Sequence, residues 1–149
     1  MQQTTQTDSY TPSSYTPSKS ISTTEAKDFL QRLSKIDFGP IAFKLMHPDE
    51  GEGWEIERTT QAIEAYRQFL FLSAKYPTQR IVPSREVDLV WHTHILDTAK
   101  YREDCNLLFG KFIDHWPYFG MNSEAEKQAS EQAFATTQAL AKKHFGKTI

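Results

Sequence analysis

The apolar residues between positions 56 and 75 recur at every third or fourth place, and this spacing restricts the fold more than any other feature of the chain. When the stretch is helical, one face collects Ala62, Ile63, Tyr66, Phe69 and Leu70, and Pro77 marks its end. No segment of useful length alternates apolar and polar residues as a half-buried strand would. We therefore expect an all-α protein whose longest helix spans about 56–75.

Capping and helix-breaking residues predict the other helices. Ser22 and Glu25 form a capping-box pattern at the start of a helix over about 23–37, which Gly39-Pro40 ends. The apolar stretch 41–46 is too short to assign by periodicity, and of a helical turn or a brief buried strand we favour the helical turn.

The second half of the chain contains three further predicted helices. Ser84 caps a helix over about 84–95, Gly110 closes one over about 98–109, and an Ala- and Gln-rich helix over 123–144 ends at Gly146. Pro117 and Gly120 break the aromatic-rich stretch 112–120, which should be an ordered loop. We expect about five helices in one compact domain.

The first 21 residues differ in composition from the rest. They are rich in Gln, Thr, Ser, Pro and Tyr, and SYTPS occurs twice in tandem at 9–13 and 14–18. Such a composition buries too little apolar surface to offset the entropy of ordering it. We expect residues 1–21 to be a disordered tail and residues 22–149 a single helical domain.

Charge and cysteine content restrict the partners and the compartment. The net charge is −2 and there is no Lys/Arg block, which argues against a nucleic-acid partner. No apolar run approaches the roughly 20 residues that span a bilayer, and no signal-peptide pattern is seen. The lone Cys105 cannot form an internal disulfide. These features predict a cytoplasmic protein that binds no membrane and whose partner is a protein or a small molecule.

Most of the chemically versatile side chains lie between Val82 and Gly120. This segment contains the only cysteine, three of the five histidines and several aspartates among large apolar residues. A buried polar group without a partner costs about 1–3 kcal/mol, so these groups need either a metal ion or a closed hydrogen-bond network.

Helical spacing predicts which of these side chains share a face of their helix. Asp88 and His92 share one face, whereas His94 diverges from His92 by about 200° around the axis and joins the apolar side of the helix. From the next helix, Asp104 or Cys105 could meet Asp88 and His92, and His115 would approach from the loop.

Three interpretations of this centre remain open. Asp88, His92, Cys105 and His115 together would suit zinc or iron, although no established ligand spacing is present. In the second interpretation the chain is a non-catalytic interaction module in which the cluster is structural: His92 bonds Asp88, His94 bonds a backbone carbonyl, and Cys105 packs as a small hydrophobe. In the third, Cys105 is a nucleophile with His92 or His115 as its base.

The stretch VPSREVDLVWHTHILDTAKYREDC resembles the glycine-rich domain-containing-protein-like family, a former domain of unknown function, and in particular its compact bacterial branch. KLM at 44–46, AYRQFLFL at 65–72 and HWPYFG extend the likeness to about residues 24–146. The chain departs from the family pattern at Asp114, where a histidine is usual. The resemblance implies a domain type and a candidate site, but no reaction. Its motif falls on Asp88, Trp91, His92, His94, Tyr101, Asp104, Cys105 and His115.

Overall fold

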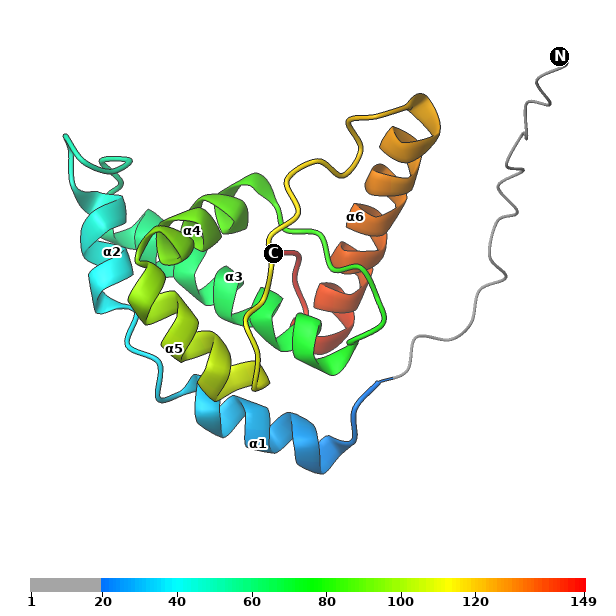
Figure 1. Ribbon diagram of the computed structural model, residues 1–149, viewed down its shortest axis with the longest axis horizontal. Coiled ribbons are helices and arrows are strands. Elements are labelled where there is room, and N and C mark those ends of the chain that lie inside the picture. Colours follow the sequence, from blue (N-terminus) through cyan, green and yellow to red (C-terminus); the bar gives the residue numbers. More distant parts are fainter. Residues whose placement is uncertain (1–19) are drawn as a thin grey trace, which may run out of the picture.

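A computed structural model describes residues 20–149, and within them every regular element is a helix (Figure 1). The predicted all-α class is confirmed, with six helices in place of about five. Most of the predicted disordered tail lies outside the described residues. Ile21, which we assigned to that tail, is bonded to the end of α3 through its N–H and its carbonyl. The helices are α1 (Thr23–Leu33), α2 (Gly39–Met46), α3 (Ile56–Lys75), α4 (Arg85–Leu96), α5 (Thr98–Phe109) and α6 (Glu124–Phe145).

The largest difference from the predicted boundaries lies between α1 and α2. The capping box of Ser22 and Glu25 is present, but α1 ends at Leu33, four residues earlier than predicted. Gly39-Pro40 begins α2 rather than ending α1. Proline suits the first turn of a helix, where its missing N–H leaves no hydrogen bond unmade.

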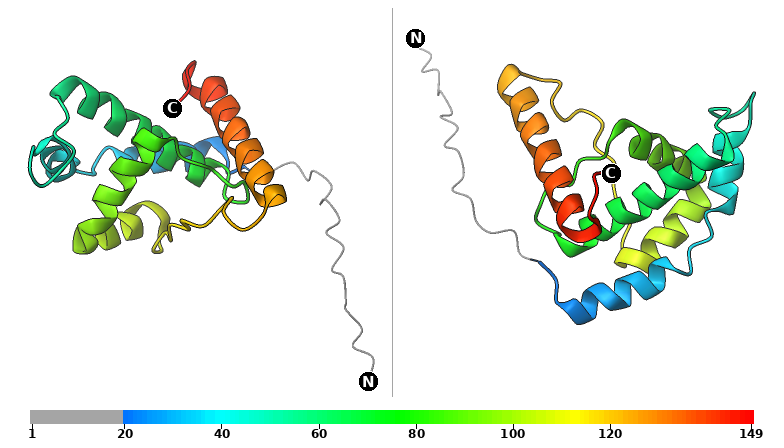
Figure 2. Two further views of the ribbon diagram at one scale, coloured as in Figure 1. Left: turned by 90° about the horizontal axis from the view of Figure 1, so that it is seen from above. Right: turned by 180° about the vertical axis from the view of Figure 1, so that it is seen from behind.

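Helix α3 is the centre of the molecule. Its predicted bounds are confirmed, and it packs against α1, α2, α4 and α6. Tyr66 and Leu72 on its inner faces are fully buried. The views in Figure 2 agree that α6 lies to one side, next to α3. The four consecutive residues Phe69 to Leu72 are all buried, so this part of α3 is enclosed on every side, whereas its first half keeps an exposed polar face.

Helices α4 and α5 form a hairpin that positions the candidate site. Ser84 caps α4 by accepting from the N–H of Val87, as predicted. Gly110 adopts a left-handed conformation (φ 69°) that ends α5, and residues 112–120 follow without a helix. Within residues 20–149, no helix combines the length and apolar character needed to cross a bilayer.

Candidate metal centre

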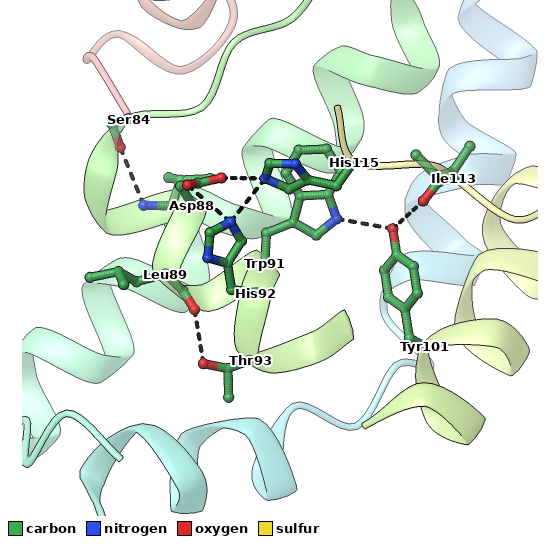
Figure 3. Close-up of polar contacts among 10 residues, drawn as sticks. Ser84, Asp88, Leu89, Trp91, His92, Thr93, Tyr101, Ile113 and His115 are labelled. Carbon is green, nitrogen blue, oxygen red and sulfur yellow. Dashed lines mark hydrogen bonds and ion pairs between the residues drawn. The ribbon is translucent and has the colours of Figure 1, made fainter. Parts of the chain in front are cut away.

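Three side chains from α4 and the loop after α5 converge on one point (Figure 3). His92 Nε2 lies 3.1 Å from Asp88 Oδ2, which confirms the contact predicted from their shared helix face. His115 Nε2 lies 2.6 Å from Asp88 Oδ1 and 3.0 Å from His92 Nε2. Asp88, His92 and His115 are called the Asp-His-His cluster below.

Hydrogen bonds alone cannot satisfy this triangle while Asp88 is ionised. A carboxylate has no proton to donate, and each Nε2 atom carries at most one. If both Nε2 atoms are protonated, both can donate to Asp88, but the two donor nitrogens then lie side by side, only 3.0 Å apart, with no hydrogen bond between them. If either Nε2 is bare, its lone pair faces a carboxylate oxygen. Every such protonation state therefore leaves one repulsive contact, which a cation between the three atoms would remove.

The dimensions of the cluster are close to those of a metal site. Tetrahedral coordination at about 2.0–2.1 Å separates ligand atoms by about 3.3 Å, so the three side chains would move apart by less than about 1 Å. Their exposure is graded: the side chain of His92 is 48% exposed, that of Asp88 32% and that of His115 16%. Three protein ligands at a partly open surface leave coordination positions for water or another ligand.

An aromatic pair holds His115 in place. The ring of Trp91 lies against the imidazole of His115, with centroids 4.2 Å apart. The indole N–H of Trp91 donates to Tyr101 Oη (2.9 Å), and Tyr101 donates to the carbonyl of Ile113 (2.6 Å). Burial raises the pKa of Tyr101, so its hydroxyl keeps its proton. Tyr101 thus connects α5 both to Trp91 and to the loop that carries His115 (Figure 3).

Cys105 is not part of this centre, contrary to our four-ligand prediction. Its side chain is buried on the inner face of α5, and the group of potential ligands contains only Asp88, His92 and His115. Burial raises the pKa of the Cys105 thiol. A buried thiol with a raised pKa is a poor ligand and a poor nucleophile, which also removes the basis for the catalytic-cysteine interpretation.

His94 belongs to a second, interior network. As the spacing predicted, it points away from His92, and it is fully buried. Its Nε2 lies 2.8 Å from Asp104 Oδ2, and its Nδ1 lies 2.9 Å from the hydroxyl of Tyr66. Lys100 Nζ lies 3.1 Å from the same oxygen of Asp104.

This network corrects two predictions. Asp104 meets His94 instead of Asp88 and His92, and His94 bonds side chains instead of a backbone carbonyl. Sequence reasoning missed Tyr66, which lies among the core residues of α3 and carries no separate signal. Burial lowers the pKa of His94 and outweighs its hydrogen bond to Asp104, so the imidazole is neutral at pH 7.

A groove of about 910 Å³ adjoins the Asp-His-His cluster. Its walls are α1, the C-terminal part of α3, the connection to α4, the first two turns of α4, residues 108–119 and Ser130 of α6. Asp88 and His115 belong to this lining, as do Trp91 and Trp116. The groove places a space of small-molecule size next to the cluster.

Comparisons with known proteins support the predicted family. A family model described as UCP032817-like matches residues 31–142. Glycine-rich domain-containing protein 2 of Arabidopsis thaliana is 30% identical over 91 residues, which are 58% of this chain and 11% of that protein. Glycine-rich domain-containing protein 1 of the same plant is 36% identical over 59 residues, 37% of this chain and 7% of that protein. The chain thus matches only a small part of these curated relatives. No solved structure matches it.

Proposed function

We propose that this chain, which belongs to the UCP032817-like family, binds a divalent transition-metal ion through Asp88, His92 and His115. The observation that supports this most strongly is the triangle of mutually close ligand atoms, which no proton arrangement satisfies while Asp88 is ionised. Two imidazoles and one carboxylate suit zinc or iron(II). The open coordination positions would let a small ligand or a water molecule bind the ion directly.

The proposal extends to the setting of the site. We propose that residues 22–149 form one folded domain around the apolar core that α1 to α6 share. We also keep the cytoplasmic location, supported by the one cysteine, which is buried and free. The compact bacterial branch of the family remains a prediction.

Metal analysis and thermal melting test the site. Protein purified without a nickel column should bind about one equivalent of zinc or iron, and a chelator should lower its melting temperature because a ligand of the native state stabilises it. His92→Ala and His115→Ala should each abolish metal binding. His47→Ala, which alters a histidine in the connection between α2 and α3, is the matched control and should keep it.

Cys105→Ser distinguishes three protein ligands from four. Its metal content should equal that of the wild type, because the thiol lies outside the cluster. A wild type that holds less than about a tenth of an equivalent after incubation with zinc or iron(II), and that melts at the same temperature with and without chelator, would refute the metal site.

Exposed aromatic side chains favour a second candidate function. The loop that carries His115 also exposes Phe112, Trp116 and Tyr118, each by half or more, and Met121 follows it. Clustered exposed apolar side chains are typical of binding surfaces. In this alternative the chain is a non-catalytic protein-interaction module whose cluster is structural. His92→Ala would then still destabilise the fold, and combining it with Asp88→Ala would cost less than the sum of the two single changes.

A further inference from the structure

The groove beside the cluster combines an apolar floor with a positively charged rim. Its floor is built by buried or half-buried side chains of three elements, namely Phe29, Phe69, Leu70, Leu108 and Phe109. Such a floor favours the apolar body of a ligand, because burying apolar surface is favourable without any directional contact. The volume of about 910 Å³ lies within the range of about 300–1,000 Å³ typical of small-molecule sites.

Most of the cationic side chains that line the groove have no carboxylate partner among the described residues. Arg80, Arg85 and Lys111 line it, and none of them forms an ion pair with a carboxylate within residues 20–149. Arg80 lies over the ring of Phe119, 3.7 Å from its centroid, and is held at the groove by that contact. Arg85 lies one helical turn before Asp88 on α4 and therefore faces the same side.

The acidic side chains on the groove are fewer and mostly engaged. Glu25 caps α1 by accepting from the backbone N–H of Ser22, and Asp88 belongs to the cluster. Asp114 is exposed at the surface. A fourth cation, Arg32, donates to the carbonyl of Leu108 within the wall. The groove thus has cations available for an anionic ligand, and a divalent ion at the cluster would add to that positive charge.

We infer that the groove binds an organic carboxylate, with the apolar body of the ligand on the aromatic floor and its carboxylate among Arg85, Lys111 and the cluster. Carboxylates form short charge-assisted hydrogen bonds with guanidinium and ammonium groups. The carboxylate's contact with a metal ion rests on the proposed function. The attraction of the carboxylate to Arg85 and Lys111 does not depend on a metal ion. The groove inference and the metal site can therefore be refuted separately.

The tryptophans provide the readout. Trp91 and Trp116 line the groove, whereas Trp54 is buried elsewhere beside Arg58 and serves as an internal control. In ¹H–¹⁵N spectra of the full chain, 2-naphthoate should shift the indole signals of Trp91 and Trp116 and leave that of Trp54 in place. The neutral isostere 2-naphthamide should bind about tenfold more weakly, because it lacks the charge.

Charge variants test the rim. Arg85→Gln combined with Lys111→Gln should weaken 2-naphthoate binding by about threefold to tenfold, as expected for partly exposed ion pairs. Arg102→Gln, an exposed arginine of α5 outside the groove, is the matched control and should leave binding unchanged. Circular dichroism should show that all variants fold, since the altered side chains are exposed.

The results of these binding experiments distinguish the groove inference from the proposed metal site. Equal affinity for acid and amide, a double variant that binds like the wild type, or equal shifts at Trp54 and Trp116 would each overturn the inference. Zinc loading should tighten 2-naphthoate binding if the proposed metal site exists. A protein that binds neither zinc nor iron(II) but shows the charge preference supports the groove and refutes the metal site.

Discussion

Removing one hydroxyl, in Tyr101→Phe, should disturb both the core and the candidate metal centre. Tyr101 is 2% exposed, so phenylalanine fills nearly the same buried space and the change isolates two hydrogen bonds. The indole N–H of Trp91 would lose its acceptor, and the carbonyl of Ile113 would lose its donor. A buried group left without a partner costs about 1–3 kcal/mol. Ile113 is half-buried and can bond water, so we expect a total loss of about 2–4 kcal/mol.

Urea unfolding at 25 °C measures this loss directly. The midpoint should fall while the dependence of the unfolding free energy on urea stays that of the wild type, because the compactness of both states is unchanged. Tyr118→Phe removes the same group from an exposed position and should change stability by less than about 0.5 kcal/mol. A loss below about 1 kcal/mol for Tyr101→Phe would refute the view that its hydroxyl connects α5 to the His115 loop.

Two further predictions concern the interior. Burial lowers the pKa of His94, so as pH falls below the ordinary value of 6.5 the unfolded chain takes up a proton before the folded protein does. The unfolding free energy should therefore fall by up to about 1.4 kcal/mol per pH unit as pH drops below 6.5, and His94→Gln should flatten that slope. Urea unfolding of both proteins at pH 7, 6 and 5.5 measures the two slopes. Equal slopes for the wild type and His94→Gln would contradict the assignment to His94. Thr137→Val removes the hydroxyl that accepts from the N–H of Val82 at 2.9 Å and should cost about 1–3 kcal/mol by thermal melting. Its half-buried neighbour Thr136→Val is the control, and an equal effect of both would be inconsistent with this role.

Much of the fold follows from local patterns in the chain. The apolar spacing of α3, the caps Ser22 and Ser84 and the closing Gly110 predict most helix positions, because these signals act within a few residues. The predicted end of the first helix at Gly39-Pro40 was wrong because the same pair can follow one helix or begin the next. In the structure Ile36 and Phe38, which lie between the two helices, are buried in the core, and this tertiary contact is not visible in the local pattern.

The candidate site was predictable where one helix determines it. Asp88 and His92 are four residues apart, so helical geometry alone brings them together. The positions of Asp104 and Cys105 depend on how α5 is rotated against α4, which is a property of the tertiary packing. One residue of a helix corresponds to about 100° around its axis, so neighbouring side chains can reach quite different surroundings. For that reason Cys105 was wrongly included and the partnership of Tyr66 with His94 was missed.

One wall of the groove comes from a part of the chain that contains none of the proposed metal ligands. Substitutions in that part can change the shape of the groove independently of the ligands. The ligating atoms belong to α4 and the loop after α5, whereas Ile21 and Phe29, which also line the groove, lie at the start of the described residues. Substitutions near the N-terminus can therefore reshape the space for a ligand while the coordinating atoms stay in place. Evolution, or a protein engineer, can exchange the bound molecule in one region without rebuilding the chemistry in the other.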